Sequence, residues 1–156
     1  MSLVKMVLLC ILAAILVSMV QDAKANPDVT IMSGFLSQHS GSNNISNTTG
    51  RPYNENNHGI GLKFNRSGWM LGTYRNSHYK QTVYVGKEWV TDRVGPFQLG
   101  VVAAVGTGYN SFVMPAVLPE FIVNMWRAQL VFIAQPFKVS SSTSPMVAMQ
   151  LRWNIW

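Results

Sequence analysis

The chain has 156 residues, of which 48% are hydrophobic and only 12% charged, and its formal net charge is +6 at pH 7. This length favours one domain rather than two, and the composition excludes intrinsic disorder and a coiled coil. The single cysteine, Cys10, excludes a fold held together by disulfide bonds within the chain.

The first 25 residues have the features of a secretory signal peptide. Lys5 is followed by the apolar run Met6–Val20, and the segment ends in the small-x-small sequence Ala23-Lys24-Ala25. The run is shorter than the roughly 20 apolar residues that a membrane-spanning helix needs. We therefore predict cleavage after residue 25 and a mature domain of residues 26–156, which contains no cysteine.

In the mature domain, apolar residues alternate with polar or small ones, which is the period of a β-strand, and no stretch keeps a helical period. The segment His58–Asn65, for example, places Ile60, Leu62 and Phe64 on one face and Lys63 with two glycines on the other. Eight strands are predicted in chain order: Val29–Leu36, His58–Asn65, Trp69–Asn76, Gln81–Trp89, Phe97–Gly108, Val117–Met125, Gln129–Ala134 and Val147–Ile155.

The connections between these strands alternate between longer and shorter ones along the chain. An even number of strands with short turns at one end and longer loops at the other is typical of β-barrels in the bacterial outer membrane. A closed barrel also satisfies every backbone polar group inside lipid. We therefore predict an all-β fold, an eight-stranded antiparallel up-and-down transmembrane β-barrel located in the outer membrane.

The alternative is a soluble periplasmic barrel or sandwich, in which alternating strands are equally natural. Two features favour the membrane. One strand face is apolar while the opposite face is rich in Gly, Gln and Asn, which is the inverse of a water-soluble barrel with an apolar core. Aromatic residues also gather at strand ends, as interfacial girdles require: Trp69, Trp89, Phe97, Trp126, Trp153 and Trp156.

The alternation of connections also sorts the reactive side chains between the two ends of the barrel. The longer connections carry or adjoin the groups suited to acid-base chemistry or anion binding: His39, His58, His78, Arg51, Arg75 and Lys80. The histidines lack the short ligand spacing of a zinc site, so no metal is predicted. The basic residues suit the phosphates of lipopolysaccharide, whereas nucleic acid is a poor partner for an exported chain with positive charge at both ends.

From Arg51 to the C-terminus, the chain resembles the lipid A palmitoyltransferases of bacterial outer membranes. The resemblance rests on short motifs in a shared order and spacing: Tyr53-Asn54-Glu55 with Gly59-Ile60-Gly61, Trp69-x-x-Gly72-x-Tyr74, Asn76-Ser77-x-x-Lys80 with Gly86 and Trp89, Phe97-Gln98-Leu99-Gly100, Met114-Pro115-Ala116-Val117-Leu118-Pro119, and Leu151-Arg152-Trp153-Asn154. It implies an eight-stranded barrel that moves a palmitoyl chain from a phospholipid to lipid A without a metal or cofactor. We expect a monomer, as is usual for small barrels.

The resemblance also implies the site residues. The family's active-site histidine corresponds to His39, and its Asp-Ser pair corresponds to Asn76 and Ser77. Residues expected to bind substrate at the loops are Arg51, Tyr53, Glu55, Arg75 and Lys80. Residues expected to line the acyl pocket, on the inward face of two neighbouring strands, are Met70, Gly72, Tyr84, Gly86 and Glu88.

Two positions depart from the family pattern. Asn76 can hold a hydrogen bond but carries no charge to stabilise an imidazolium, so we expect His39-assisted transfer to be slower. Glu88 stands where the family has a glycine at the floor of the acyl pocket. A buried carboxylate needs a partner, and we predict that Arg152 on the last strand provides it. A filled floor predicts a shallower pocket and a shorter acyl chain.

Two functions follow from these observations. The first is transfer of an acyl chain from a phospholipid to lipid A, favoured by His39, Ser77 and the Tyr53-Asn54-Glu55 motif. The second is a catalytically impaired barrel with a surface-modifying or phage-exclusion role, favoured by Asn76 and Glu88. We expect the first as the functional class.

Overall fold

The computed structural model describes residues 28–40, 45–46, 49–109, 113–136 and 144–155. The predicted signal peptide and Trp156 lie outside these residues. Within the described ranges, no helix is long and apolar enough to cross a membrane.

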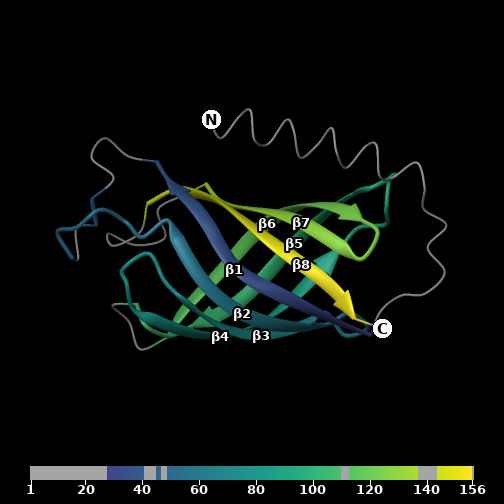
Figure 1. The fold of residues 1–156 in the computed structure, drawn as a ribbon, viewed down its shortest axis with the longest axis horizontal. Coiled ribbons are helices and arrows are strands. Elements are labelled where there is room, and N and C mark those ends of the chain that lie inside the picture. Colours follow the sequence, from purple (N-terminus) through teal and green to yellow (C-terminus); the bar gives the residue numbers. More distant parts are fainter. Residues whose placement is uncertain (1–27, 41–44, 47–48, 110–112, 137–143, 156) are drawn as a thin grey trace.

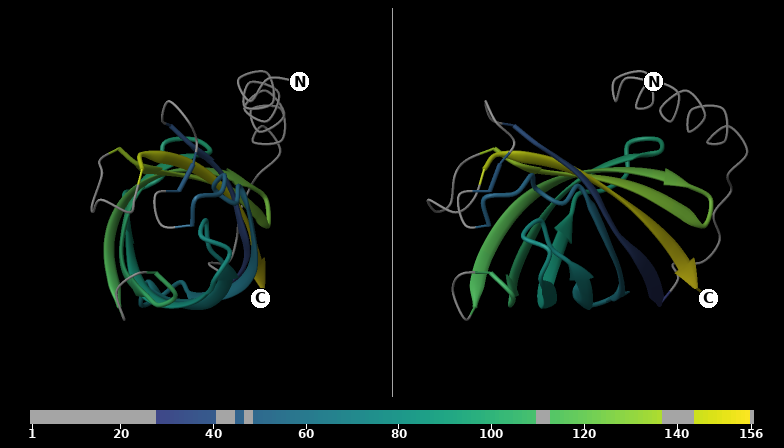
Figure 2. Two further views of the ribbon diagram at one scale, coloured as in Figure 1. Left: turned by 90° about the vertical axis from the view of Figure 1, so that its left-hand side faces the viewer. Right: turned by 60° about the vertical axis from the view of Figure 1, so that its left-hand side comes forward.

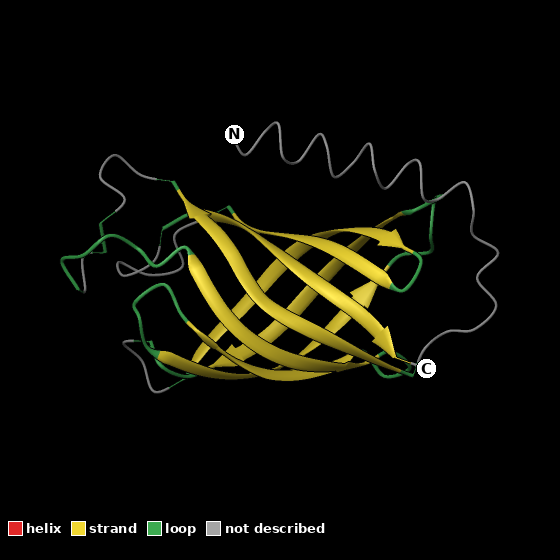
Figure 3. Cartoon of the chain, in the orientation of Figure 1, coloured by secondary structure: helices red, strands yellow, loops and turns green. Residues whose placement is uncertain are grey.

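The period-two pattern of the sequence produces eight strands, which make up almost all of the regular structure in Figures 1 and 3. In chain order they are β1 (Val29–His39), β2 (Asn56–Phe64), β3 (Trp69–Arg75), β4 (Gln81–Val90), β5 (Phe97–Gly106), β6 (Met114–Met125), β7 (Ala128–Gln135) and β8 (Met146–Ile155).

The strands form one closed sheet. Each strand pairs antiparallel with the next, and β1 also pairs with β8 along its length, from Val29↔Ile155 to His39↔Met146. The left view of Figure 2 looks into the resulting ring. Closure removes the unpaired edges that an open sheet would carry. The prediction of an eight-stranded antiparallel barrel is confirmed.

The two ends of the barrel differ in their connections (Figure 1). We call the left-hand end in Figure 1 the loop end; it carries the connections of residues 40–55, 76–80, 107–113 and 136–145. The right-hand end is the turn end, with the connections of residues 65–68, 91–96 and 126–127. Three of the four loop-end connections are longer than any turn-end connection, as predicted, whereas the connection of residues 76–80 is one residue shorter than that of residues 91–96.

Strand β1 runs further than predicted, through His39 rather than ending at Leu36. The cause is a β-bulge around Gly34, where the register to both neighbouring strands shifts. Only glycine fits there, because a Cβ would lie 2.1 Å from the backbone oxygen of Asn57. The bulge turns Ser37 and His39 into the lumen, so these polar residues extend the strand while their backbones pair with β8.

Strand β6 begins at Met114 rather than at the predicted Val117, and its first half pairs only with β5. The β6–β7 ladder runs from Glu120↔Ile133 to the turn. Among the described residues, Met114–Pro119 therefore has no ladder partner on the β7 side. Pro115 and Pro119 lack the N–H that a central strand donates and suit such an edge segment. The barrel wall is consequently unpaired between β6 and β7 at the loop end.

The barrel is apolar outside, and its lumen contains many polar and charged side chains. The outer face carries exposed apolar side chains along every strand except β7: Ile31, Ile60, Leu62, Leu71, Val83, Val85, Leu99, Val101, Val117, Leu151 and Ile155. The lumen holds buried polar and charged ones: Thr30, Lys63, Glu88, Glu120, Gln129, Gln150, Arg152 and Asn154. This distribution agrees with the face assignment made from the sequence and is the reverse of a water-soluble barrel.

Candidate functional site

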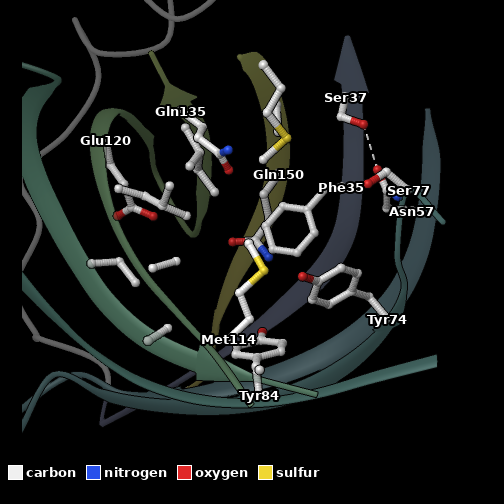
Figure 4. A pocket seen from close by; sticks show the side chains of 18 of the residues that line it. Phe35, Ser37, Asn57, Tyr74, Ser77, Tyr84, Met114, Glu120, Gln135 and Gln150 are labelled. Atoms are coloured by element: carbon white, nitrogen blue, oxygen red, sulfur yellow. Dashed lines mark hydrogen bonds between the residues drawn. The ribbon is translucent and has the colours of Figure 1, made fainter. Parts of the chain in front are cut away.

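A cavity of about 120 Å³ occupies the lumen toward the loop end (Figure 4). Its wall is mostly apolar because the inward positions of the strands are apolar at this level, as the following lining residues illustrate: Phe35, Met70, Tyr84, Val102, Leu118 and Ile133. The unpaired part of β6 contributes Met114 and Ala116 to the same wall. An enclosed apolar wall suits a hydrocarbon chain better than a polar small molecule.

Two glycines allow the side chain of Tyr84 to extend into the lumen. A Cβ on Gly61 would lie 2.5 Å from the Tyr84 hydroxyl, and a Cβ on Gly72 would lie 2.7 Å from it. Gly86 makes a similar close approach, since a Cβ there would lie 2.7 Å from the Cβ of Ala104. Gly61, Gly72 and Gly86 therefore leave room for the side chains that shape the cavity. Of the residues predicted to line the acyl pocket, Met70 and Tyr84 do line the cavity.

The floor of the cavity is an ion cluster of four buried side chains, Lys63, Glu88, Glu120 and Arg152. Glu88 accepts hydrogen bonds from Nζ of Lys63 and Nη1 of Arg152. Nη2 of Arg152 donates to Oε1 of Glu120 at 2.9 Å, and its Nε donates to Oε1 of Gln150 at 2.8 Å. The predicted pairing of Glu88 with Arg152 is confirmed.

The ion cluster divides the lumen into two compartments. Glu120 and Arg152 line the apolar cavity above it, whereas Lys63 lines a polar cavity of about 450 Å³ at the turn end. Glu88 does not line the apolar cavity; it lies behind the floor and holds Arg152 in place. Two positive and two negative side chains meet here, which is the arrangement that buried charges require.

His39 lies at the loop end, beyond Leu36, the last exposed apolar residue of β1. Its ring stacks on Tyr53, with centroids 4.3 Å apart and an interplanar angle of 13°. Only 9% of His39 is exposed, and its Nδ1 has no hydrogen-bond partner among the described residues. Burial lowers the pKa of His39; Glu55 opposes this shift and His78 adds to it. The neutral imidazole, which can accept a proton, is therefore favoured.

His78 joins three of the loop-end connections. Its Nδ1 lies 2.9 Å from Oγ of Ser46 in the first connection. Its ring meets Tyr53 edge-on, with centroids 5.8 Å apart, and meets Tyr109 of the third connection in the same way at 5.9 Å. The hydroxyl of Tyr109 lies 2.9 Å from that of Tyr74 at the edge of the cavity. His78 thus fixes the side chain on which His39 stacks.

The three histidines do not converge as the sequence suggested. His39 and His78 both contact Tyr53, but His58 is exposed on the outer face of β2. Alternation along β2 already placed His58 on the face of Ile60, so its direction was predictable. The contacts of His78 were missed because they depend on the conformations of loops.

Asn76 is fully buried, and its amide forms four hydrogen bonds. Oδ1 accepts from the backbone N–H groups of His78 and Lys80, at 2.9 and 3.0 Å. Nδ2 donates to the backbone oxygen of Gly108 at 2.8 Å and to Oγ1 of Thr82 at 3.1 Å. An amide has two N–H donors, so neither remains for a reacting ester. The geometry gives Asn76 a role in positioning the β3–β4 turn.

Ser77 lines the cavity at its loop-end mouth, close to Asn57 in Figure 4. The backbone oxygen of Ser77 accepts a hydrogen bond of 2.9 Å from the backbone N–H of Asn54, the centre of the Tyr53-Asn54-Glu55 motif. That motif therefore supports both predicted reactive residues, because its tyrosine packs on His39 and its asparagine holds the backbone of Ser77.

The remaining predicted substrate-binding residues are exposed at the loop end: Arg51, Glu55, Arg75 and Lys80. Arg75 lies over the ring of Tyr79, with its guanidinium carbon 5.5 Å from the centroid, and donates from Nε to the Tyr79 backbone oxygen at 3.3 Å. None of the three cations in this set lines the apolar cavity.

In the described part of the chain, no group of three or more His, Cys, Asp or Glu residues is placed to hold a metal ion. Comparison of the chain with protein-family models and with curated proteins finds no match. The resemblance to the lipid A palmitoyltransferases therefore stays a prediction from the motifs.

Proposed function

We propose that the chain is an outer-membrane acyltransferase that moves an acyl chain from a phospholipid to lipid A. The observation that carries this proposal is an apolar cavity inside the barrel that is lined by Ser77 and by Met146, the strand partner of the buried, stacked His39. A hydrocarbon cavity next to a proton acceptor suits a reaction on the ester that joins an acyl chain to its headgroup.

The membrane setting is supported by the outer surface of the barrel. Apolar residues are exposed around the sheet, and Trp69, Trp89, Trp126 and Trp153 are all exposed near the turn end. Tryptophan concentrates at the boundary between hydrocarbon and headgroups. In this orientation the loop end faces the outer leaflet, where lipid A resides.

The proposed reaction is a direct transfer between two hydroxyl groups. His39 removes the proton of a lipid A hydroxyl, whose oxygen attacks the acyl ester carbonyl held at the cavity mouth. The hydroxyl of Ser77 donates a hydrogen bond to the oxyanion that forms. The bond to the glycerol oxygen then breaks, His39 returns the proton to that oxygen, and the products are a lysophospholipid and acylated lipid A.

The acceptor is held by charge. Arg51, Arg75 and Lys80 are exposed around the mouth, and guanidinium and ammonium groups bind the phosphates of lipid A. The acyl chain of the donor enters the cavity from the leaflet through the unpaired segment between β6 and β7, whose residues also line the cavity.

The ion cluster sets the length of the acyl chain. Glu120 and Arg152 close the cavity with charged groups that a hydrocarbon cannot displace. We therefore propose a donor chain shorter than palmitate, which refines the resemblance to the palmitoyltransferases.

The second candidate is a barrel that has lost the chemistry and acts at the cell surface, for example in phage exclusion. It is favoured by Asn76, whose uncharged amide uses both of its N–H groups in hydrogen bonds to Thr82 and Gly108 and offers no support to an imidazolium.

Expression in cells that lack their own enzyme separates the two candidates. The first predicts lipid A heavier by one acyl chain in the mass spectrum, and no added mass for His39→Ala produced at the same level. Absence of the added mass from the parent chain would refute acyl transfer to lipid A. Added mass that survives His39→Ala would refute the role of His39.

A further inference from the structure

We propose that Lys87, Trp69 and Trp89 form a binding site for the phosphate group of an anionic phospholipid, on the outer face of the barrel at the turn end. The proposal rests on the membrane setting put forward above and is independent of acyl transfer.

The site is formed by two adjacent strands. Lys87 of β4 pairs directly with Trp69 of β3, and Trp89 follows two residues later on the same face of β4. The Nζ atom of Lys87 lies 5.9 Å from the ring centroid of Trp69 and 5.6 Å from that of Trp89. Both rings are about half exposed, at 50% and 53%. The ammonium group is therefore held between two indoles that face the surroundings.

This cation has no anionic partner in the part of the chain that the structure describes. Among the described residues, no carboxylate lies within 4.0 Å of Lys87. Its neighbours on the outer face toward the loop end are the exposed apolar residues Leu71, Val85 and Val105. A lysine on the lipid face costs about 2–4 kcal/mol at the centre of a bilayer and almost nothing at its boundary. Lys87 and its tryptophans therefore mark the headgroup level, where the available anion is a phosphate.

A second pair with the same chemistry lies at the same end of the barrel. The guanidinium carbon of Arg127 is 5.1 Å from the ring centroid of Trp126, which packs edge-on against Trp153 with centroids 6.4 Å apart. Cations are thus held on tryptophans at two places around the turn end.

The arrangement favours an anionic lipid over a zwitterionic one. The Lys87 ammonium group can donate hydrogen bonds to phosphate oxygens, and each of the two adjacent indoles offers one N–H donor. A zwitterionic headgroup brings its own cation close to Lys87, which reduces the net attraction. Each basic residue near an anionic surface contributes about fivefold to binding.

Native mass spectrometry of the detergent-purified mature chain tests the site. Phosphatidylglycerol and phosphatidylcholine with identical acyl chains are the two probes. We expect the parent chain to retain phosphatidylglycerol preferentially, and Lys87→Gln to lose this preference by about fivefold. Arg93→Gln is the matched control, because Arg93 is an exposed cation at the same end and contacts no ring in the described structure.

Equal retention of the two lipids by the parent chain would overturn the proposal, as would a preference unchanged in Lys87→Gln or lost equally in Arg93→Gln. Heat-dependent migration on gels establishes that each variant is folded, and Lys87→Arg should keep the preference. A parent chain that retains phosphatidylglycerol but does not acylate lipid A would refute the proposed function alone. A chain that stays soluble without detergent and retains neither lipid would refute both.

Discussion

Nδ2 of Asn76 donates a hydrogen bond of 2.8 Å to the backbone oxygen of Gly108 and thereby ties the β3–β4 turn to the end of β5. The resemblance suggested that an aspartate here would restore activity, but a carboxylate would place an oxygen against this carbonyl. We expect Asn76→Asp to lower the free energy of unfolding by about 1–3 kcal/mol, the cost of an unsatisfied buried group.

The measurement is urea unfolding followed by tryptophan fluorescence. Asn56→Asp adds the same charge at an exposed position of the loop end and should leave the stability near that of the parent. An Asn76→Asp variant as stable as the parent chain would contradict the role given to this hydrogen bond.

The ion cluster gives a second prediction. Glu88 accepts hydrogen bonds from both Lys63 and Arg152, so Glu88→Gln leaves two buried cations facing Glu120 alone. We expect a loss of roughly 3–5 kcal/mol in unfolding free energy, the usual cost of breaking a buried ion pair. Asp92→Asn, which removes an exposed carboxylate at the turn end, is the control. A loss below that of the control would mean that the cluster is not held as described.

The role of the ion cluster in setting the acyl-chain length can be tested without leaving a buried charge unpaired. Removing Glu120 and Arg152 together, as the double variant Glu120→Ala/Arg152→Ala, leaves the Lys63–Glu88 ion pair intact and opens the floor of the cavity. We expect the chain-length profile of transferred acyl groups to shift toward longer chains. Gln98→Ala, in the polar cavity below the cluster, should keep the parent profile. An unchanged profile in the double variant would remove the cluster as the determinant of length.

The pH dependence of activity follows from the pKa of His39. The proposed reaction requires the neutral imidazole, so we expect activity to fall as the pH drops through this pKa. The negative charge of Glu55 raises the pKa of His39, opposing the lowering by burial. Glu55→Gln therefore lowers the pKa further, and the acid limb of the activity profile should move to lower pH. Asp28→Asn, at the opposite end, should leave the limb in place; a shift to higher pH in Glu55→Gln would be inconsistent with the assignment.

The strands, their inward faces and the pairing of Glu88 with Arg152 could be predicted because they depend on alternation, which is local. The alternation determines whether a side chain points into or out of the barrel, and the position along the strand determines how far the side chain lies from each end of the barrel. The involvement of Lys63 and Glu120 was missed because it depends on how four alternate strands stagger around the barrel, although both residues lie on predictable inward faces.

The mouth of the cavity was harder to predict. The bulge at Gly34 reverses the alternation before His39, and no local pattern marks it. The contacts of His78 with Ser46, Tyr53 and Tyr109 join residues from three connections. The period of hydrophobic residues predicts strands but does not determine the conformations of these connections. The four hydrogen bonds of the Asn76 amide likewise depend on how the β3–β4 turn and the residues after β5 fold, which the motif around Asn76 does not show.

The most direct test of acyl transfer uses the purified mature chain with two defined lipids. Phospholipid with deuterium-labelled acyl chains is mixed with unlabelled lipid A and the protein in detergent, and mass spectrometry identifies the products that carry the label. We predict labelled acyl-lipid A and an equal amount of lysophospholipid, both abolished in His39→Ala. Labelled free fatty acid without labelled lipid A, or no release of label at all, would contradict the account.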